Sequence, residues 1–222
     1  MTTSPQYGPV ELISPHLDES AVVRGGAPDA PIVLLMHGLG SDERDLAGLV
    51  AFLPPVFEYV SVRGIFRYVQ GYAWFDMPVD PGRSEAIEAS AAAVEEWIAA
   101  QDRPVVGAIG FSQGGAVALQ LLRRDPHALR FVVNLSGFPF PTAMEGDAAL
   151  AEERPPALWG HGGMDPLYDP EREQAVREFM SAHTTLEEER RPQLGHAVDE
   201  IELRAVAAFL QRRAAGFLDR RS

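Results

Sequence analysis

Residues 110–114 read Gly-Phe-Ser-Gln-Gly, directly after an apolar run at residues 105–109 and directly before a helical pattern at residues 116–124. A serine with a glycine two positions away on either side fits a sharp turn from a buried strand into a helix, where its hydroxyl is lifted clear of the sheet. A Cβ in place of either glycine would collide with the neighbouring strand or helix. The pattern predicts that Ser112 is a nucleophile, although an ordinary glycine-rich turn shares it.

Strand-like and helix-like segments alternate along most of the chain. Further strands, most of them short apolar runs, are expected at residues 32–36, 59–62, 131–135, 157–159 and 185–189. Further helices are expected at residues 44–52, 84–100, 170–182 and 198–213. This alternation predicts an α/β fold in which helices cover both faces of a mostly parallel central sheet.

Three regions depart from this alternation. Residues 10–13 and 21–24 predict a leading β-hairpin. Residues 64–82 and 138–153 are expected to form long irregular loops. The chain has neither an internal repeat nor a low-complexity linker, so we expect residues 1–222 to form a single domain.

The composition excludes several classes of function. The 222-residue chain has a net charge of −13, which argues against nucleic acid and anionic membrane surfaces as partners. It contains no cysteine, so disulfides, thiolate metal sites and a cysteine nucleophile are excluded. No apolar run approaches the length of a transmembrane helix, and residues 1–9 lack a signal-peptide pattern. We therefore expect a cytoplasmic protein without stable membrane insertion.

A serine nucleophile needs a base, normally a histidine that is oriented by a carboxylate. Of the six histidines, His37, His161 and His196 each follow a predicted strand and so share the carboxyl edge of the sheet. Where the nucleophile lies on a strand-to-helix turn, the chain order is serine, acid, histidine, with the histidine after the last strand. His196 alone follows the strand at residues 185–189, and we predict that it is the base.

Two aspartates compete for the role of the acid. Asp165 and Asp169 both follow the strand at residues 157–159, and both precede a proline. Asp169-Pro170 fits a helix N-cap followed by proline at the first helical position. Asp165 is therefore the predicted partner of His196, although an Asp-Pro turn is a common structural feature.

The oxyanion of a tetrahedral intermediate needs two preplaced N–H donors. One is expected to be the backbone amide of Gln113, directly after the serine. The other is expected from residues 37–42, His-Gly-Leu-Gly-Ser-Asp, where two glycines let the loop fold tightly and leave the Leu39 amide free. A simple turn after the strand is the alternative for this loop.

Five blocks carry a family resemblance: residues 35–42, 73–76 (Ala-Trp-Phe-Asp), 110–115, 161–166 (His-Gly-Gly-Met-Asp-Pro) and 195–196 (Gly-His). Together, and in this order, they resemble the bacterial carboxylesterase/phospholipase family, which is similar to acyl-protein thioesterases. The resemblance covers the chain from about Val10 to Leu210. One departure is Ala197-Val198, where the family often has Glu-Ile, which affects substrate-side details near His196.

The resemblance implies an α/β-hydrolase fold without a large cap domain. It also implies a Ser112–Asp165–His196 triad and an oxyanion hole from the amides of Leu39 and Gln113. The implied function is a serine carboxylesterase that hydrolyses short-to-medium acyl esters through an acyl-enzyme. Acyl-protein or acyl-CoA thioesters and lysophospholipids are alternative substrates. A non-catalytic binding protein is the competing class, but such members usually lack the base or the nucleophile.

Large apolar residues in the two long loops and next to the motifs predict the walls of an acyl-binding cleft. They are Trp74, Phe75, Met77, Phe111, Phe138, Phe140, Met144 and Leu167. Each could instead pack a loop onto the body of the protein. We expect no metal and no organic cofactor, because serine ester hydrolysis needs neither. The expected partner is a small-molecule acyl ester, and a homodimer is compatible with the sequence.

Overall fold

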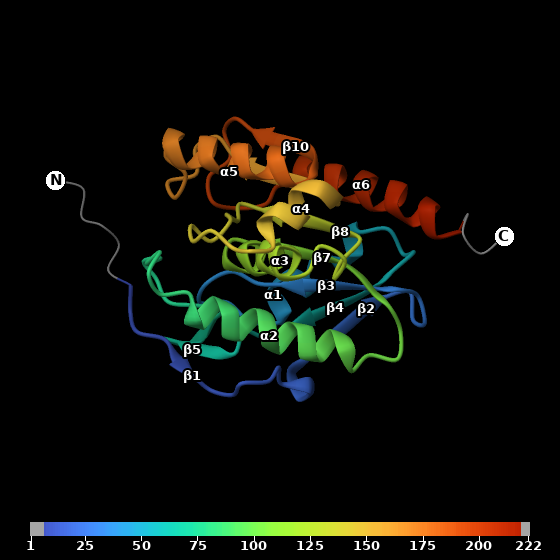
Figure 1. Ribbon diagram of the computed structural model, residues 1–222. Helices are drawn as coiled ribbons and strands as arrows, with labels where there is room; N and C mark the ends of the chain where they lie inside the picture. The colour runs from blue at the N-terminus through green and yellow to red at the C-terminus, as the bar shows by residue number, and fades with distance from the viewer. Residues whose placement is uncertain (1–6, 219–222) are drawn as a thin grey trace.

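A seven-stranded sheet forms the centre of the protein in the computed structural model, which describes residues 7–218 (Figure 1). In spatial order its strands are β10 (Thr185–Arg191), β9 (Pro156–Gly162), β8 (Phe131–Leu135), β7 (Val105–Phe111), β3 (Ile32–Met36), β4 (Glu58–Val62) and β2 (Val23–Gly26). The first six run parallel, and β2 lies antiparallel to β4 at one edge. The predicted α/β architecture with a mostly parallel sheet is confirmed.

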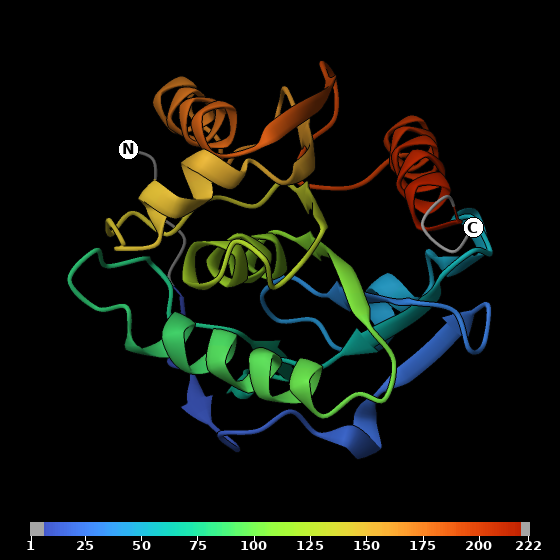
Figure 2. The ribbon, with the colours of Figure 1, turned by 45° about the vertical axis from the view of Figure 1, so that its right-hand side comes forward.

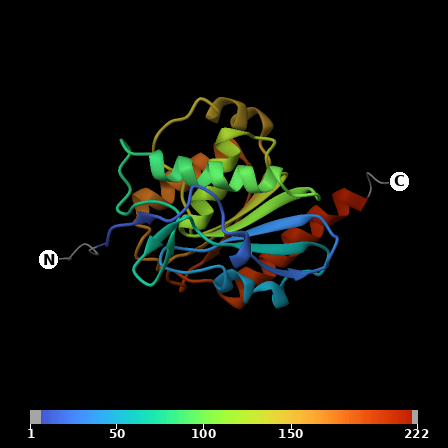
Figure 3. The ribbon, with the colours of Figure 1, turned by 90° about the horizontal axis from the view of Figure 1, so that it is seen from below.

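Helices cover both faces of this sheet. They are α1 (Arg44–Ala47), α2 (Glu85–Ala99), α3 (Gln113–Arg124), α4 (Asp147–Glu153), α5 (Pro170–His183) and α6 (Glu200–Leu218). Apolar side chains of α2, α3, α4 and α5 form one core with the sheet, whereas those of α1 and α6 form a second core on the other face. Figure 2 shows α2 and α6 on opposite sides of the sheet, and Figure 3 shows α1 across the sheet from α2.

Burial on both faces explains why the central strands are almost purely apolar. Every residue of β3 and of β8 is buried. β3 is paired in parallel with β4 and β7, and β8 is paired with β7 and β9, so neither strand has an edge open to water. Such strands keep no polar face and appear in the sequence as continuous apolar runs.

The predicted leading hairpin is wrong. β1 (Glu11–Leu12) pairs with β5 (Phe66–Tyr68) in a separate three-stranded sheet that is completed by β6 (Gly71–Ala73). β2 instead joins the central sheet beside β4. The two N-terminal strands therefore find partners far along the chain, and a local pattern cannot specify that choice.

Two expected loops and one expected helix also differ from the structure. Residues 64–82 contain the β5–β6 hairpin, and residues 138–153 end in α4. The helix expected at residues 44–52 is divided into the short α1 and a 3-10 helix, Val50–Phe52. Gly48 is the C-cap of α1, and its amide donates to the Arg44 carbonyl at 3.2 Å.

The carboxyl edge of the sheet brings the predicted site segments together. The ends of β3, β7 and β9 lead directly into residues 37–42, Ser112 and residues 163–169, and β10 leads into the loop with His196. Parallel strands end at one edge, so segments from four distant parts of the sequence meet there. Within residues 7–218, no helix combines the length and the apolar character required to cross a membrane.

Candidate active site

Ser112 occupies a strained turn between β7 and α3. Its backbone has φ 53° and ψ −115°, and it is the N-cap residue of α3. A non-glycine residue in this region costs about 1–3 kcal/mol and persists only where its surroundings fix it. Here the Ser112 amide donates to the Leu135 carbonyl oxygen at 2.8 Å, and its carbonyl accepts from the Ala116 amide at 3.1 Å. The sharp turn predicted for the serine is confirmed.

The two flanking glycines are required by close backbone contacts. A Cβ at Gly110 would lie 2.2 Å from the Gly114 carbonyl carbon. A Cβ at Gly114 would lie 2.0 Å from the Met36 carbonyl oxygen. The start of α3 therefore packs directly on the ends of β7 and β3, and any side chain at either position would displace it.

Asp165 and His196 form a hydrogen-bonded pair. The His196 Nδ1 and Asp165 Oδ2 atoms are 2.7 Å apart. The Asp165 side chain is fully buried, whereas the His196 side chain is 22% exposed and therefore reaches the surface. The second carboxylate oxygen, Oδ1, accepts from the Leu167 amide at 2.9 Å. The Phe111 ring packs against the imidazole with centroids 4.8 Å apart, which further limits its orientation.

The environment of Asp165 keeps it ionised. Burial by itself would raise the pKa of this carboxyl, but the hydrogen bonds with His196 and the Leu167 amide outweigh it and lower the pKa below its ordinary value. An ionised carboxylate only accepts hydrogen bonds, so Nδ1 of His196 carries a proton. In the neutral imidazole, Nε2 is then the unprotonated nitrogen that can accept a proton.

Asp169 has a different role from Asp165. It is the N-cap of α5, its side chain accepts from the Arg172 amide at 2.8 Å, and Pro170 opens the helix. The cap predicted from the sequence is confirmed.

The remaining histidines lie away from this pair. His37 and His161 are fully buried beneath the carboxyl edge. The other three make their own local contacts: His16 with Glu96, His127 with Glu153, and His183 with the Phe179 carbonyl.

The loop at residues 37–42 places Leu39 beside Ser112. Leu39, Gln113, Ser112 and His196 all line one cavity. Within residues 7–218, the backbone amide of Leu39 has no hydrogen-bond partner. The amide of Gln113 is at the first position of α3, where the helix itself offers no acceptor. Within residues 7–218 neither amide has a hydrogen-bond partner, and both residues line the cavity.

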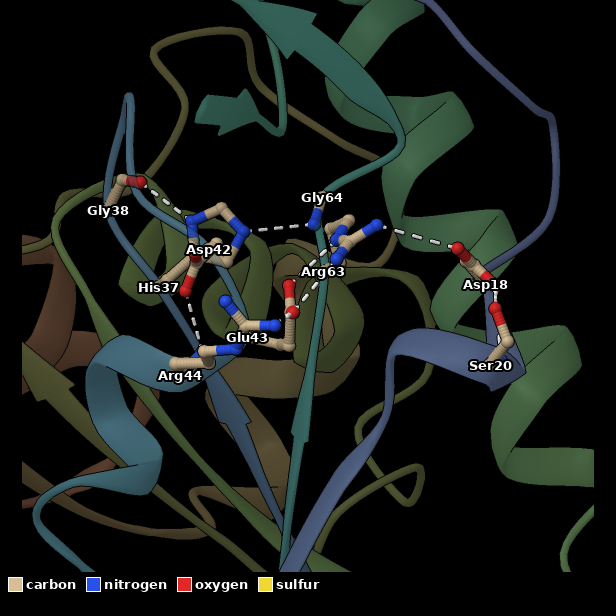
Figure 4. A network of polar contacts seen from close by, with 9 residues as sticks. All are labelled: Asp18, Ser20, His37, Gly38, Asp42, Glu43, Arg44, Arg63 and Gly64. Atoms are coloured by element: carbon tan, nitrogen blue, oxygen red, sulfur yellow. Dashed lines mark hydrogen bonds and ion pairs between the residues drawn. The ribbon is translucent and has the colours of Figure 1, made fainter. Parts of the chain in front are cut away.

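A buried polar network holds that loop in place (Figure 4). The His37 Nε2 atom accepts from the Gly64 amide at 3.0 Å, so its Nδ1 must carry the proton and donate to the Gly38 carbonyl at 2.7 Å. Burial lowers the pKa of His37, which keeps it neutral. Next to it, Arg63 forms two hydrogen bonds of 2.7 and 2.8 Å with the buried Glu43. His37 therefore holds the loop at residues 37–42 in position.

The Gln113 side chain holds a second loop. Its Oε1 accepts from the Trp74 amide and its Nε2 donates to the Phe75 carbonyl, each at 2.9 Å. The Trp74 indole in turn donates to the His37 carbonyl at 2.9 Å. These contacts fix the segment after β6 to the start of α3, while the two aromatic rings lie in the core.

The cavity beside Ser112 has a volume of about 270 Å³. Four of the eight predicted apolar wall residues line it: Met77, Phe111, Phe138 and Leu167. The other four do not. Trp74, Phe75 and Phe140 are buried in the main core, and Met144 lies near Gln120, where it lines a different hollow with residues from the C-terminal end of α3. Their predicted contact with substrate is corrected accordingly.

The sequence analysis did not identify Tyr7, Ser136, Tyr168 or Arg172 as cavity residues, although all four line it. The sequence offered one indication for Tyr168 and Arg172. They flank the predicted Asp169-Pro170 helix start, and a helix that begins after a parallel strand begins at the carboxyl edge. Among the described residues, no group of three or more His, Asp or Glu side chains is placed to hold a metal ion.

A buried carboxyl group lies under this edge at Glu202, in the first turn of α6. It is fully buried, and neither carboxylate oxygen has a hydrogen-bond partner within the described part of the chain. Burial raises its pKa to about 8, with a further rise from Asp199 and Glu189 and an opposing effect of Arg191. Glu202 is therefore protonated in the folded protein at neutral pH.

Glu202→Gln should remove a pH-dependent loss of stability. The unfolded chain releases this proton near its ordinary pKa of about 4.5, whereas the folded chain retains it to about pH 8, so the free energy of unfolding falls as the pH rises between these values. From pH 5 to pH 8 the variant should gain about 4 kcal/mol relative to the original protein. Urea unfolding at both pH values measures this difference.

Glu200→Gln is the matched control, because this exposed glutamate lies two residues earlier in α6 and pairs with Arg204. The difference in unfolding free energy between Glu200→Gln and the original protein should be nearly the same at pH 5 and pH 8. An equal difference at pH 5 and pH 8 for Glu202→Gln would contradict the assignment of a neutral buried acid.

The whole arrangement matches a known family. Residues 17–213 match the phospholipase/carboxylesterase family, which is most of the chain. The chain belongs to the phospholipase/carboxylesterase family. Carboxylesterase SOBER1 of Arabidopsis thaliana is 31% identical over 157 residues, which cover 65% of this chain and 69% of the relative. A probable SOBER1-like carboxylesterase from the same plant is 30% identical over 154 residues, covering 64% of this chain and 59% of that protein.

Solved structures of esterases and of a thioesterase share the fold. The Bacillus cereus carboxylesterase superposes with a TM-score of 0.73 at 21% identity, covering 86% of this chain and 93% of the other. Esterase PE8 superposes with a TM-score of 0.71 at 25% identity, covering 89% of this chain and 99% of the other. Acyl-protein thioesterase 2 of Zea mays superposes with a TM-score of 0.68 at 20% identity, covering 87% of this chain and 98% of the other. The protein has the α/β-hydrolase fold without a large cap, and its family identifies it as a serine hydrolase.

Proposed function

We propose that the protein hydrolyses carboxylic esters with short acyl groups, using Ser112 as nucleophile, His196 as base and Asp165 as its orienting acid. One observation carries the proposal: a serine in a strained turn and a histidine bonded to a buried carboxylate line the same cavity. The cavity of about 270 Å³ is at the lower end of ligand-pocket sizes, which favours short acyl groups.

The proposed reaction has two halves. The Ser112 Oγ atom attacks the ester carbonyl carbon while Nε2 of His196 takes its proton, and the Leu39 and Gln113 amides stabilise the resulting oxyanion. The C–O bond to the alcohol then breaks, and His196 protonates the departing alcohol. Water attacks the acyl-serine in the same way, which releases the carboxylic acid and returns the proton to Ser112.

A fluorophosphonate probe tests this proposal, because it reacts only with an activated serine. One phosphonyl adduct per chain is expected, on the peptide that carries Ser112, as mass spectrometry would detect. His196→Ala should slow labelling by about 10²-fold or more, since the serine then lacks its base. An adduct at another residue, or labelling of His196→Ala at the original rate, would refute the assignment.

The same chemistry cleaves thioesters and lysophospholipids, which differ in the leaving group. A panel of 4-nitrophenyl esters from acetate to decanoate, run beside an acyl-CoA and a lysophospholipid, separates these alternatives. We expect kcat/KM to be higher for the short acyl chains than for decanoate, because the cavity is small for a ligand pocket.

A further inference from the structure

Arg172 is a cation in the wall of the cavity that holds Ser112 and His196. It lies in the first turn of α5, and its Nη1 donates to the Leu167 carbonyl at 3.0 Å. Its Cζ atom lies 5.5 Å from the centre of the Phe138 ring, which supports one face of the guanidinium. These two contacts hold the side chain at the cavity, while its other N–H donors have no partner within residues 7–218.

No carboxylate within the described part of the chain pairs with Arg172, although acids surround it in the sequence. Asp169 is occupied as the N-cap of α5. Glu173 is bonded to Arg177 and Arg190. Most of the arginines within residues 7–218 are paired with acids, so an unpaired one in the wall of the cavity that Ser112 lines is available to a ligand.

Among the described residues, the wall of the cavity has one acidic residue, and it lies on a different element from Arg172. Asp45 belongs to α1 and accepts from the Ser41 hydroxyl at 2.7 Å. Arg172 instead shares its region with Phe138, Leu167 and Tyr168. A ligand anion would therefore be attracted toward the α5 side of the cavity and repelled from the Asp45 side.

We propose that Arg172 selects esters that carry an anionic group, a carboxylate above all, within a few bonds of the scissile carbonyl. The inference rests on the proposed ester hydrolysis and names its substrate class. Free guanidinium donors suit a carboxylate because both groups are planar and can form two parallel hydrogen bonds. The anion can be on the acyl part or on the alcohol part of the ester.

Matched substrates test this selectivity. Mono-4-nitrophenyl glutarate carries a carboxylate on the acyl part, 4-carboxyphenyl butyrate carries one on the leaving group, and 4-nitrophenyl valerate and phenyl butyrate are their neutral counterparts. The quantity to compare is the ratio of kcat/KM for the charged ester to that for its neutral counterpart. In Arg172→Gln this ratio should fall about 10-fold for the substrate pair whose carboxylate reaches Arg172. Arg172→Lys should retain part of this preference.

Arg67→Gln is the control, because Arg67 is also exposed and has no acid partner among residues 7–218, but contacts Tyr72 outside the cavity. It removes the same charge and should leave both ratios unchanged. Equal ratios in Arg172→Gln and in the original protein for both arms overturn the proposal. Loss of the preference in Arg67→Gln as well would indicate a general charge effect and also overturn it.

A binding measurement separates this proposal from the proposed hydrolysis. Glutaramate has one carboxylate and an amide in place of the ester, and glutaramide is its neutral analogue. Calorimetry should show that the original protein binds glutaramate more tightly than glutaramide, with the difference lost in Arg172→Gln. If no ester is hydrolysed but this difference is present, the hydrolysis fails and the anion site stands. If neutral esters are hydrolysed, glutaramate does not bind and the 4-carboxyphenyl butyrate ratio is unchanged in Arg172→Gln, the anion site fails alone.

Discussion

Replacing Ser112 with alanine should lower kcat for 4-nitrophenyl butyrate by about 10³-fold or more. The substitution removes the attacking oxygen and keeps the Cβ atom, so the strained backbone at φ 53° is as well tolerated as before. The hydrogen bonds of the Ser112 amide and carbonyl with Leu135 and Ala116 are backbone contacts and persist. The loss should therefore appear in turnover, while the midpoint of thermal unfolding changes by only a few degrees.

Ser84→Ala is a suitable control for this variant. Ser84 precedes α2, and its side chain makes no capping hydrogen bond, so its hydroxyl should be dispensable for both folding and turnover. If Ser112→Ala retained the original kcat, another nucleophile or an attack by activated water would have to replace the proposed mechanism.

Elements whose environment is set by burial were predictable from the sequence. Strands buried on both faces are mostly apolar: β3 has only apolar residues, and Asn134 is the one polar residue of β8, so both strands can be recognised in the sequence. Elements whose partners are distant were not. The segment Glu11–Leu12 pairs with β5, more than fifty residues later, and its own side chains do not specify this choice.

In the candidate active site, too, some features could be predicted from the sequence and others could not. Chain order predicted that Ser112 and His196 lie at one edge of the sheet, because parallel strands bring their carboxyl ends together, and both residues do line one cavity. His196 is bonded to Asp165, the aspartate that the helix-cap argument left for this position. The walls of the cavity were harder to predict. Trp74 follows β6, but the Gln113 side chain holds its backbone at the surface of α3, and the ring enters the core. An aromatic residue near a motif therefore does not reveal which way its ring points.

Asp165→Asn should lower kcat by about 10²–10⁴-fold, whereas Asp169→Asn should leave it within about 2-fold. Asp165 accepts two hydrogen bonds, one at each oxygen, from the Leu167 amide and from His196. Asparagine has one oxygen, so its NH₂ group would face Nδ1 of His196 if the oxygen kept the Leu167 bond. Nδ1 would then have to accept, and the proton would move to Nε2, which could no longer take the Ser112 proton.

The comparison with Asp169 separates catalysis from folding. Asparagine is nearly as good an N-cap as aspartate, so Asp169→Asn should cost less than about 1 kcal/mol of unfolding free energy. Steady-state kinetics and urea unfolding of both variants give the two quantities. The effect of Asp165→Asn should appear in kcat more than in KM, because the orientation of the base matters most in the transition state. Loss of turnover in Asp169→Asn with normal turnover in Asp165→Asn would show that the acid is the other aspartate.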